Sequence, residues 1–298
     1  MILLRFTSFG LALFVAVAIN GPLQAALRRS GAATAADRLQ IAVSRLLCRA
    51  LGLRVRLSGH PPAGALVVSN HVSWTDILVL GAATPLCFVA KADVATWPFL
   101  GRAVRAHGTL FVSRRRTKQL PEVNRAIAET MRSGRPVVLF AEGTTGNGTR
   151  LEKFHSGHLG AACDLLLAGD ATRRTVPVVP AALAYTHCDG LPTSHRDRLA
   201  LSWMGDESLL PHLLALLRRR GPIRCDIVFG ETLQVARDAD RKAVCADVRR
   251  HVHGMVGALV TGRSPAVVTS PVIAGPSAIR SAQMSPVLQP NLPSGSLS

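Results

Sequence analysis

The chain has 298 residues and a formal net charge of +17, from 35 lysines and arginines against 18 aspartates and glutamates. Hydrophobic residues make up 48% of the chain, which excludes a globally disordered protein. The charge favours an anionic partner, such as nucleic acid, an anionic lipid surface or an acidic substrate. Because aromatic residues amount to only 4% and single-strand binders usually stack bases on aromatic rings, we expect no nucleic-acid partner.

The first segment carries no charge between Arg5 and Arg28, and it is strongly apolar from Phe6 to Ile19. Its full length is close to the roughly 20 residues that a membrane span requires. Asn20-Gly21-Pro22 interrupts the apolar run, so an interfacial or re-entrant helix fits equally well. A cleaved signal peptide and a buried helix are the alternatives.

Two observations favour a retained membrane anchor over residues 1–27. The six cysteines are scattered without a CxxC pair, as is typical of a reduced, intracellular protein with buried thiols. Arg28-Arg29 follows the apolar segment directly, and basic residues mark the cytoplasmic side of a membrane segment. We therefore expect the body of the protein at the cytoplasmic face of the inner (plasma) membrane.

Residues 28–262 alternate short apolar runs with helical patterns, beginning with a helix over 35–51. The expected strands cover 53–57, 65–69, 86–90, 109–112, 136–140, 176–185 and 223–229. The expected helices cover 74–82, 119–132, 156–167, 207–220 and 238–260. This alternation predicts an α/β fold with a mixed, mostly parallel sheet flanked by helices.

The end of the chain differs in composition from the body. Residues 263–298 hold six prolines, eight serines and two charged residues, Arg263 and Arg280. This stretch has too little periodic apolar content to form a core, so we predict a disordered tail.

The expected strand over 65–69 ends just before His71, and Asp76 follows five residues later. A positioned imidazole can remove a proton from a hydroxyl, and a carboxylate would fix its tautomer and stabilise the imidazolium. Residues five apart on a helix point about 140° away from each other, so the pair meets only if His71 precedes the helix. The alternative is a histidine in a turn and an aspartate placed for a helix N-terminus.

Two further strands end at polar groups. Arg114 follows the strand over 109–112, and guanidinium groups suit bidentate recognition of phosphate, although a solvated basic loop explains it as well. Glu142 follows the strand over 136–140 and begins a loop with Gly143, Gly146 and Gly148. Such glycines let main-chain N–H groups approach a ligand, but the Lys-Ser/Thr ending of a nucleotide P-loop is absent.

Together with Val176-Pro177-Val178-Val179-Pro180, these segments resemble the glycerolipid acyltransferase family, which includes 1-acylglycerol-3-phosphate acyltransferases. That family carries an Asn-His-(x)4-Asp block, a Gly-x-x-Phe-Val-x-Arg block, a Phe-Pro-Glu-Gly-Thr block and a Val-x-Pro-Val block. Their order and spacing match across residues 70–180, and the first and third are the most specific. The stretch from Gly190 to Asp206 is also similar to the bacterial branch near lyso-ornithine-lipid acyltransferases.

The resemblance implies transfer of a fatty acyl group from acyl-CoA or acyl carrier protein to a lysolipid hydroxyl, with 1-acylglycerol-3-phosphate or lyso-ornithine lipid as acceptor. His71 would be the general base and Asp76 its orienting partner. Arg114, Glu142, Gly143 and Thr144 would contact the substrate. No metal and no cofactor beyond the acyl donor is implied. The basic body also fits an anionic membrane surface, because each cationic residue near it contributes about 1 kcal/mol.

Many lysophosphatidate enzymes continue Glu-Gly-Thr with arginine, and this chain has Thr145 there. One expected phosphate ligand is therefore missing, and Arg150 is the nearest replacement along the loop. Two other functional classes remain open from the sequence: a secreted hydrolase with a cleaved signal, and a non-catalytic basic protein on a membrane or nucleic acid.

Overall fold

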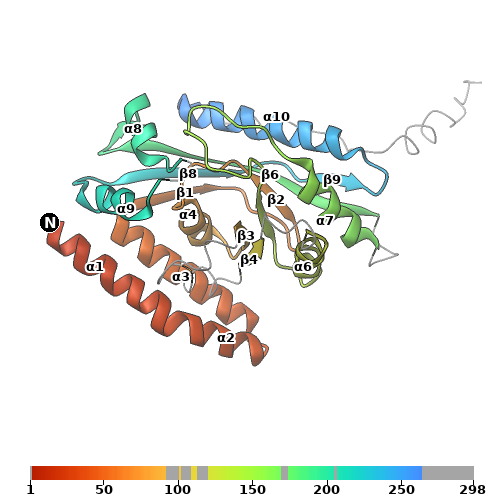
Figure 1. The fold of residues 1–298 in the computed structure, drawn as a ribbon, viewed down its shortest axis with the longest axis horizontal. Coiled ribbons are helices and arrows are strands. Elements are labelled where there is room, and N and C mark those ends of the chain that lie inside the picture. Colours follow the sequence, from red (N-terminus) through yellow and green to blue (C-terminus); the bar gives the residue numbers. More distant parts are fainter. Residues whose placement is uncertain are drawn as a thin grey trace, which may run out of the picture.

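The computed structural model describes residues 2–91, 101, 109–112, 120–168, 174–204 and 207–263. Arg114 and the predicted tail from residue 264 onward lie outside the described residues. Figure 1 shows one central sheet with helices on both faces. The predicted α/β class is therefore confirmed.

The described part of the sheet has the strand order β1-β8-β6-β2-β5-β3-β4, and β7 and β9 also pair with β6. Strand β2 is parallel to β5 and β6, whereas β6 is antiparallel to β7, β8 and β9. The sheet is thus mixed, as predicted. The strands are β1 (Leu53–Ser58), β2 (Leu66–Ser69), β3 (Cys87–Lys91), β4 (Leu110–Val112), β5 (Val137–Phe140), β6 (Thr175–Cys188), β7 (Leu191–Pro192), β8 (Ile223–Phe229) and β9 (Leu233–Ala236).

Helices cover both faces of the sheet, which is why every residue of β2 and β5 is buried and all of them except Ser69 are apolar. One face packs against α3 (Ala33–Leu51), α4 (Asp76–Ala83) and α9 (Leu209–Arg218). The other packs against α6 (Leu120–Arg132), α7 (Ser156–Ala168) and α10 (Arg241–Val260). The short α8 (His195–Leu201) lies at one end, as Figure 1 shows.

The N-terminal segment forms one continuous helical rod made of α1 (Ile2–Phe14), a π-helical turn (Val15–Asn20) and α2 (Gly21–Arg29). The expected interruption at Asn20-Gly21-Pro22 is therefore not a break. Pro22 lacks the N–H that a helix interior uses, and the wider π-helical turn directly before it keeps the rod continuous. By length and composition, the rod is able to cross a membrane, and an 18-residue window within it has a mean hydropathy of 1.8.

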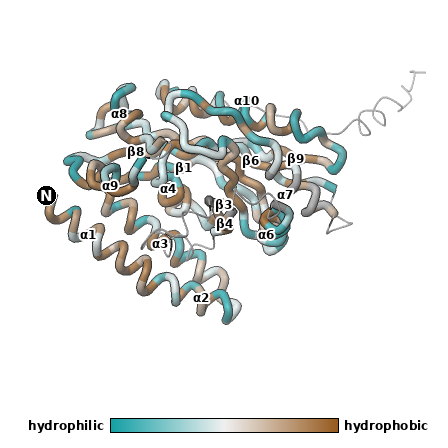
Figure 2. The backbone as a smooth tube through the Cα atoms, in the orientation of Figure 1, coloured by the Kyte–Doolittle hydropathy of each residue, from teal (hydrophilic) through white to brown (hydrophobic). Residues whose placement is uncertain are grey.

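One face of this rod packs on the body of the protein. Gly31, at φ +79°, turns the chain back so that α3 runs beside α1 and α2 (Figure 1). Phe9, Ala12 and Ala16 are buried in the core on the α3 side. Arg28 of α2 forms a 2.9 Å ion pair with Asp37 of α3, which fixes the turn between the helices. Figure 2 shows that α1 is apolar along most of its length.

Several elements differ from the sequence expectation. Strand β6 continues three residues beyond Tyr185 to Cys188, and β7, α8 and β9 were not predicted. Strand β7 has two residues and β9 has four, and β9 alternates between buried and half-buried positions over too short a stretch to give a clear periodic signal in the sequence. Helix α4 begins at Asp76, two residues after the predicted start, which leaves a turn between β2 and α4.

Candidate active site

His71 and Asp76 meet at the end of β2. The Nδ1 atom of His71 lies 2.8 Å from Oδ2 of Asp76. His71 lies in the turn after the strand and Asp76 is the first residue of α4, which is the arrangement that their spacing requires. The predicted pairing of these two side chains is present in the structure.

Asp76 is fully buried, and main-chain donors hold its carboxylate in place. Its Oδ2 atom also accepts the N–H groups of Val72 at 2.6 Å and Ser73 at 2.9 Å. Its Oδ1 atom accepts the O–H of Tyr185 at 2.7 Å. These donors replace hydrogen bonds to water that the carboxylate loses on burial, and they fix its orientation toward His71.

The imidazole of His71 is held on two sides. Its ring stacks on Phe140, the last residue of β5, with the ring centroids 4.0 Å apart and the planes 13° from parallel. Since Asp76 engages Nδ1, Nε2 is the ring nitrogen that can take a proton from a substrate. The side chain of His71 is 17% exposed, so a ligand can reach it.

Asn70 extends the sheet beyond the end of β2. Its side-chain Nδ2 donates to the carbonyl of Leu183 at 3.0 Å, and its Oδ1 accepts the N–H of Leu183 at 3.0 Å. The carboxamide therefore takes the place of a main-chain pair with β6. It fixes the point at which the chain leaves the sheet and turns toward His71.

Glu142 joins two loops through main-chain hydrogen bonds. Its Oε1 accepts the N–H of His71 at 2.8 Å, and its Oε2 accepts the N–H of Glu152 at 2.8 Å. Burial raises the pKa of the Glu142 carboxyl, and the two N–H donors oppose that shift. The N–H of Gly146 also donates to the carbonyl of His71 at 2.8 Å, so the loop after β5 wraps around the turn that carries His71.

Glycine is needed at the start of this loop. Gly143 has φ +67° and donates its N–H to the carbonyl of Phe140 at 3.0 Å, which closes a tight turn. The turn sends Glu142 inward while Thr144 stays exposed. Gly143 is half-buried and Thr144 is exposed, and their predicted role in substrate binding stays a prediction.

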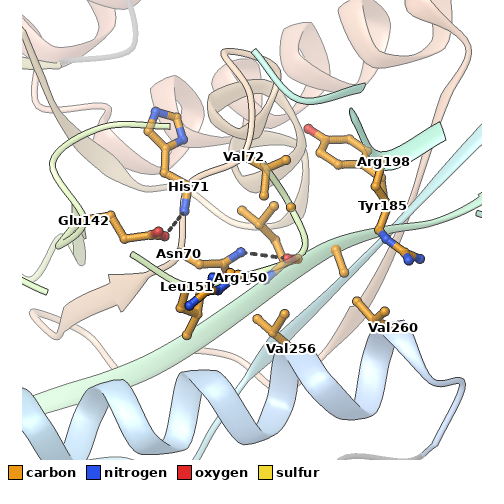
Figure 3. Close-up of a pocket in the computed structure, with 13 residues that line it drawn as sticks. Asn70, His71, Val72, Glu142, Arg150, Leu151, Tyr185, Arg198, Val256 and Val260 are labelled. Atoms are coloured by element: carbon orange, nitrogen blue, oxygen red, sulfur yellow. Dashed lines mark hydrogen bonds between the residues drawn. The ribbon is translucent and has the colours of Figure 1, made fainter. Parts of the chain in front are cut away.

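A pocket lies beside the main chain of Asn70, His71 and Val72. Figure 3 shows its walls, with Val256 and Val260 of α10 directed toward it from below. Arg150 and Arg198 are among its lining residues, and the guanidinium of Arg198 donates to the main-chain carbonyl of Thr193 at 2.8 Å. Two arginines therefore lie close to the turn that carries His71. The sequence suggested Arg150 only as a replacement ligand, and it did not suggest Arg198.

Three residues of the site have contacts that the sequence did not predict. Tyr185, Asn70 and Phe140 contact Asp76, β6 and His71, respectively. Asn70 is visible as part of the Asn-His motif, but its partner lies 113 residues away. The predicted ligand Arg114 lies outside the described residues.

Comparisons with known proteins agree on one family. The sequence profile described as Acyltransferase matches residues 54–184. The lyso-ornithine lipid O-acyltransferase of Brucella abortus (strain 2308) is 37% identical over 221 residues, which are 74% of this chain and 82% of that protein. The 1-acyl-sn-glycerol-3-phosphate acyltransferase of Neisseria gonorrhoeae is 37% identical over 115 residues, which are 38% of this chain and 45% of that protein.

A crystal structure has the same fold. The 1-acyl-sn-glycerophosphate (LPA) acyltransferase from Thermotoga maritima superposes with a TM-score of 0.60, at 17% identity, over 86% of this chain and 95% of that one. The resemblance first carried by the Asn-His-(x)4-Asp and Glu-Gly-Thr blocks thus extends over the body of the protein. The chain belongs to the acyltransferase family, and it is an O-acyltransferase of the lysolipid type.

Proposed function

We propose that this protein transfers a fatty acyl group from an acyl thioester, acyl-CoA or acyl carrier protein, to the hydroxyl of lyso-ornithine lipid. The observation that carries the reaction type is the 2.8 Å contact between His71 Nδ1 and Asp76 Oδ2 beside an accessible ring edge. The choice of lyso-ornithine lipid as the acceptor rests on the extent of sequence similarity. Relatives named as lyso-ornithine lipid O-acyltransferases match 74% of the chain, whereas the Neisseria enzymes match 38%.

His71 and Asp76 are sufficient for every proton transfer in the reaction. Nε2 of His71 takes the proton of the acceptor hydroxyl while the oxygen attacks the thioester carbonyl. Asp76 stabilises the imidazolium that forms and keeps Nδ1 protonated. When the tetrahedral intermediate collapses, the thiolate leaves and takes the proton from His71. The products are an O-acyl ester and a free thiol, and the histidine returns to its starting state.

Loop composition supports an acceptor without a phosphomonoester. A phosphomonoester carries nearly two negative charges, and a site built for it offers several cationic or N–H donors. Thr145 stands where many lysophosphatidate enzymes have arginine, and Thr144 beside it is neutral and exposed. Arg150, which lines the pocket, and Arg114 are the cations we expect to meet the single carboxylate of an ornithine head group.

Lysophosphatidate is the second candidate acceptor. The similarity to the Neisseria enzymes favours it, since those relatives are named for 1-acyl-sn-glycerol-3-phosphate. Arg150 and Arg198 would then supply charge that Thr145 does not. The two candidates differ in the number of anionic charges that the loop must neutralise.

The rod formed by α1 and α2 supports a position on the membrane surface. Its outward face exposes Leu4, Leu11 and Phe14, at 71%, 65% and 60%. The guanidinium of Arg5 donates to the carbonyls of Arg219, Arg220 and Gly221 at the end of α9, which ties the first turn to the body. We propose that the rod lies in the cytoplasmic leaflet of the inner membrane with this face in lipid.

The acceptor is tested by kcat/KM for lyso-ornithine lipid and for lysophosphatidate, with labelled acyl-CoA and acyl carrier protein as donors. Wild type should prefer lyso-ornithine lipid, and Thr145→Arg should move the preference toward lysophosphatidate. Thr145→Gln is the control, because it adds size without charge. A wild-type preference for lysophosphatidate by a hundredfold, about 2.7 kcal/mol of transition-state discrimination, would overturn the assignment.

A further inference from the structure

A buried chain of hydroxyl groups leads to the side of Asp76 that faces away from His71. Thr75 Oγ1 lies 2.6 Å from the phenol oxygen of Tyr185, and that oxygen lies 2.7 Å from Asp76 Oδ1. Thr75 and Tyr185 are 2% and 4% exposed. Tyr185 lies near the C-terminal end of β6, and Figure 3 shows it beside the loop that carries His71 and Val72.

The direction of these hydrogen bonds follows from the carboxylate. Asp76 Oδ2 already accepts from His71 and two main-chain N–H groups, and Tyr185 is the donor that the structure gives to Oδ1. If the phenol proton pointed to Thr75 instead, two oxygen lone pairs would face each other at 2.7 Å in a buried site. The phenol therefore donates to Asp76, and the hydroxyl of Thr75 donates to the phenol oxygen.

The other ionisable groups around the pair leave this arrangement in place. Cys225 of β8 faces Asp76 and Tyr185, and burial raises the pKa of its thiol well above the usual range, so it stays neutral. Glu142 faces His71 from the loop after β5, where both of its oxygens accept main-chain N–H groups. Burial, followed by the Asp76 charge, raises the pKa of Tyr185, so the phenol remains a donor throughout the working range of pH.

We propose that Tyr185, oriented by Thr75, is a positioning residue for the acyl transfer, acting through Asp76 on the protonation of His71. The proposal rests on the proposed function of His71 as the general base. The phenol stabilises the negative charge of the Asp76 carboxylate. Without it, the His71–Asp76 pair takes up a proton at higher pH, and Oδ1 is free to rotate away from the geometry that holds the imidazole.

The kinetic test uses Tyr185→Phe, which removes the hydroxyl and keeps the ring. We expect kcat to fall about ten- to a hundredfold, the scale of a lost hydrogen bond to a charged group, with KM nearly unchanged. The acid limb of the kcat/KM profile should move up by about one pH unit. Thr75→Val should shift the limb in the same direction by less, and Thr75→Ser, which keeps the hydroxyl, should restore it.

Thr193→Val is the matched control. The hydroxyl of Thr193 is also buried, and it donates to the main-chain carbonyl of Tyr185 at 2.9 Å. The Thr193→Val variant therefore shows how a local disturbance of β6 affects kcat and the acid limb when the hydrogen bond from Tyr185 to Asp76 is kept. If Thr193→Val moves the acid limb as far as Tyr185→Phe, or if Tyr185→Phe leaves kcat and the limb unchanged, Tyr185 is only structural and the proposal is wrong.

A second measurement does not depend on turnover. Tyr185 is the only tyrosine in the chain, so tyrosine labelled with ¹³C at Cζ gives a single resonance. In wild type, the chemical shift of this resonance should show a titration step at the pH of the acid limb of the kcat/KM profile. This titration step should disappear in Asp76→Asn. No step in the wild-type protein would overturn the proposal. Acyl transfer that is absent while the step is present would instead reject the proposed function and leave the coupling standing.

Discussion

The main-chain N–H of His71 donates a 2.8 Å hydrogen bond to Oε1 of Glu142, and Oε2 of the same carboxylate accepts the N–H of Glu152. A carboxylate has two acceptor oxygens, and here each one holds a different loop. Glu142 thereby fixes the main chain of His71 to the loop after β5. The structure gives this residue a positioning task, beside the substrate contact that the resemblance implies.

Glu142→Gln should disrupt this connection, because a carboxamide offers one acceptor oxygen and turns an N–H donor toward the second N–H group. We expect activity to fall about tenfold or more, and amide hydrogen exchange at His71 and Glu152 to accelerate. The control is Glu129→Gln on the exposed side of α6, which makes the same chemical change away from the site. Unchanged exchange at both amides in Glu142→Gln would contradict the role of Glu142.

Tyr185 should resist ionisation in the folded protein. Burial and the nearby Asp76 charge raise its pKa above the usual value, so stability from this shift is present below about pH 10 and is lost as pH rises further. Tyrosinate absorbance should appear near pH 10 in denaturant, and only at higher pH, together with unfolding, in the native protein. Reversible ionisation of the folded protein near pH 10 would show that the phenol is not buried against Asp76.

The exposed apolar face of α1 should control membrane binding. Combining Leu4→Gln, Leu11→Gln and Phe14→Gln removes burial in lipid worth about 1.5–3 kcal/mol for each side chain. We expect the variant to move from the membrane to the soluble fraction with an unchanged melting temperature. Weak binding that remains should fall with salt, because arginines 38, 45 and 49 are exposed along α3.

A matched variant, Leu191→Gln with Leu199→Gln, changes exposed leucines on β7 and α8 and should stay on the membrane. Association of the α1 variant that is unchanged and resistant to salt would place the membrane contact elsewhere on the protein.

Local sequence patterns were sufficient to predict the strand and the helix that hold His71 and Asp76. Strand β2 is apolar from Leu66 to Val68, and the spacing from His71 to Asp76 permits contact only across a turn into a helix, which is what the structure contains. Strand β5 and the tight turn at Gly143 follow from an apolar run and a glycine at its end. These features depend on residues that are close together in the chain.

The remainder depends on contacts between distant residues, which one sequence does not record. Tyr185 lies 109 positions from Asp76, and Arg5 lies 216 positions from Gly221, whose carbonyl it binds. The role of Glu142 was hidden for a different reason. A carboxylate at the end of a strand is equally suited to a ligand and to main-chain N–H groups, and only the folded chain shows the N–H groups of His71 and Glu152 in place.

The most direct test of the account measures acyl transfer from a labelled acyl thioester to lyso-ornithine lipid by wild type, His71→Ala and Asp76→Asn, with each variant shown to be folded by its melting curve. We expect wild type to be active and His71→Ala to lose on the order of 10²–10⁴ in kcat/KM, as for a missing general base, with a severe loss in Asp76→Asn as well. A folded His71→Ala variant that retains near wild-type kcat/KM would contradict it.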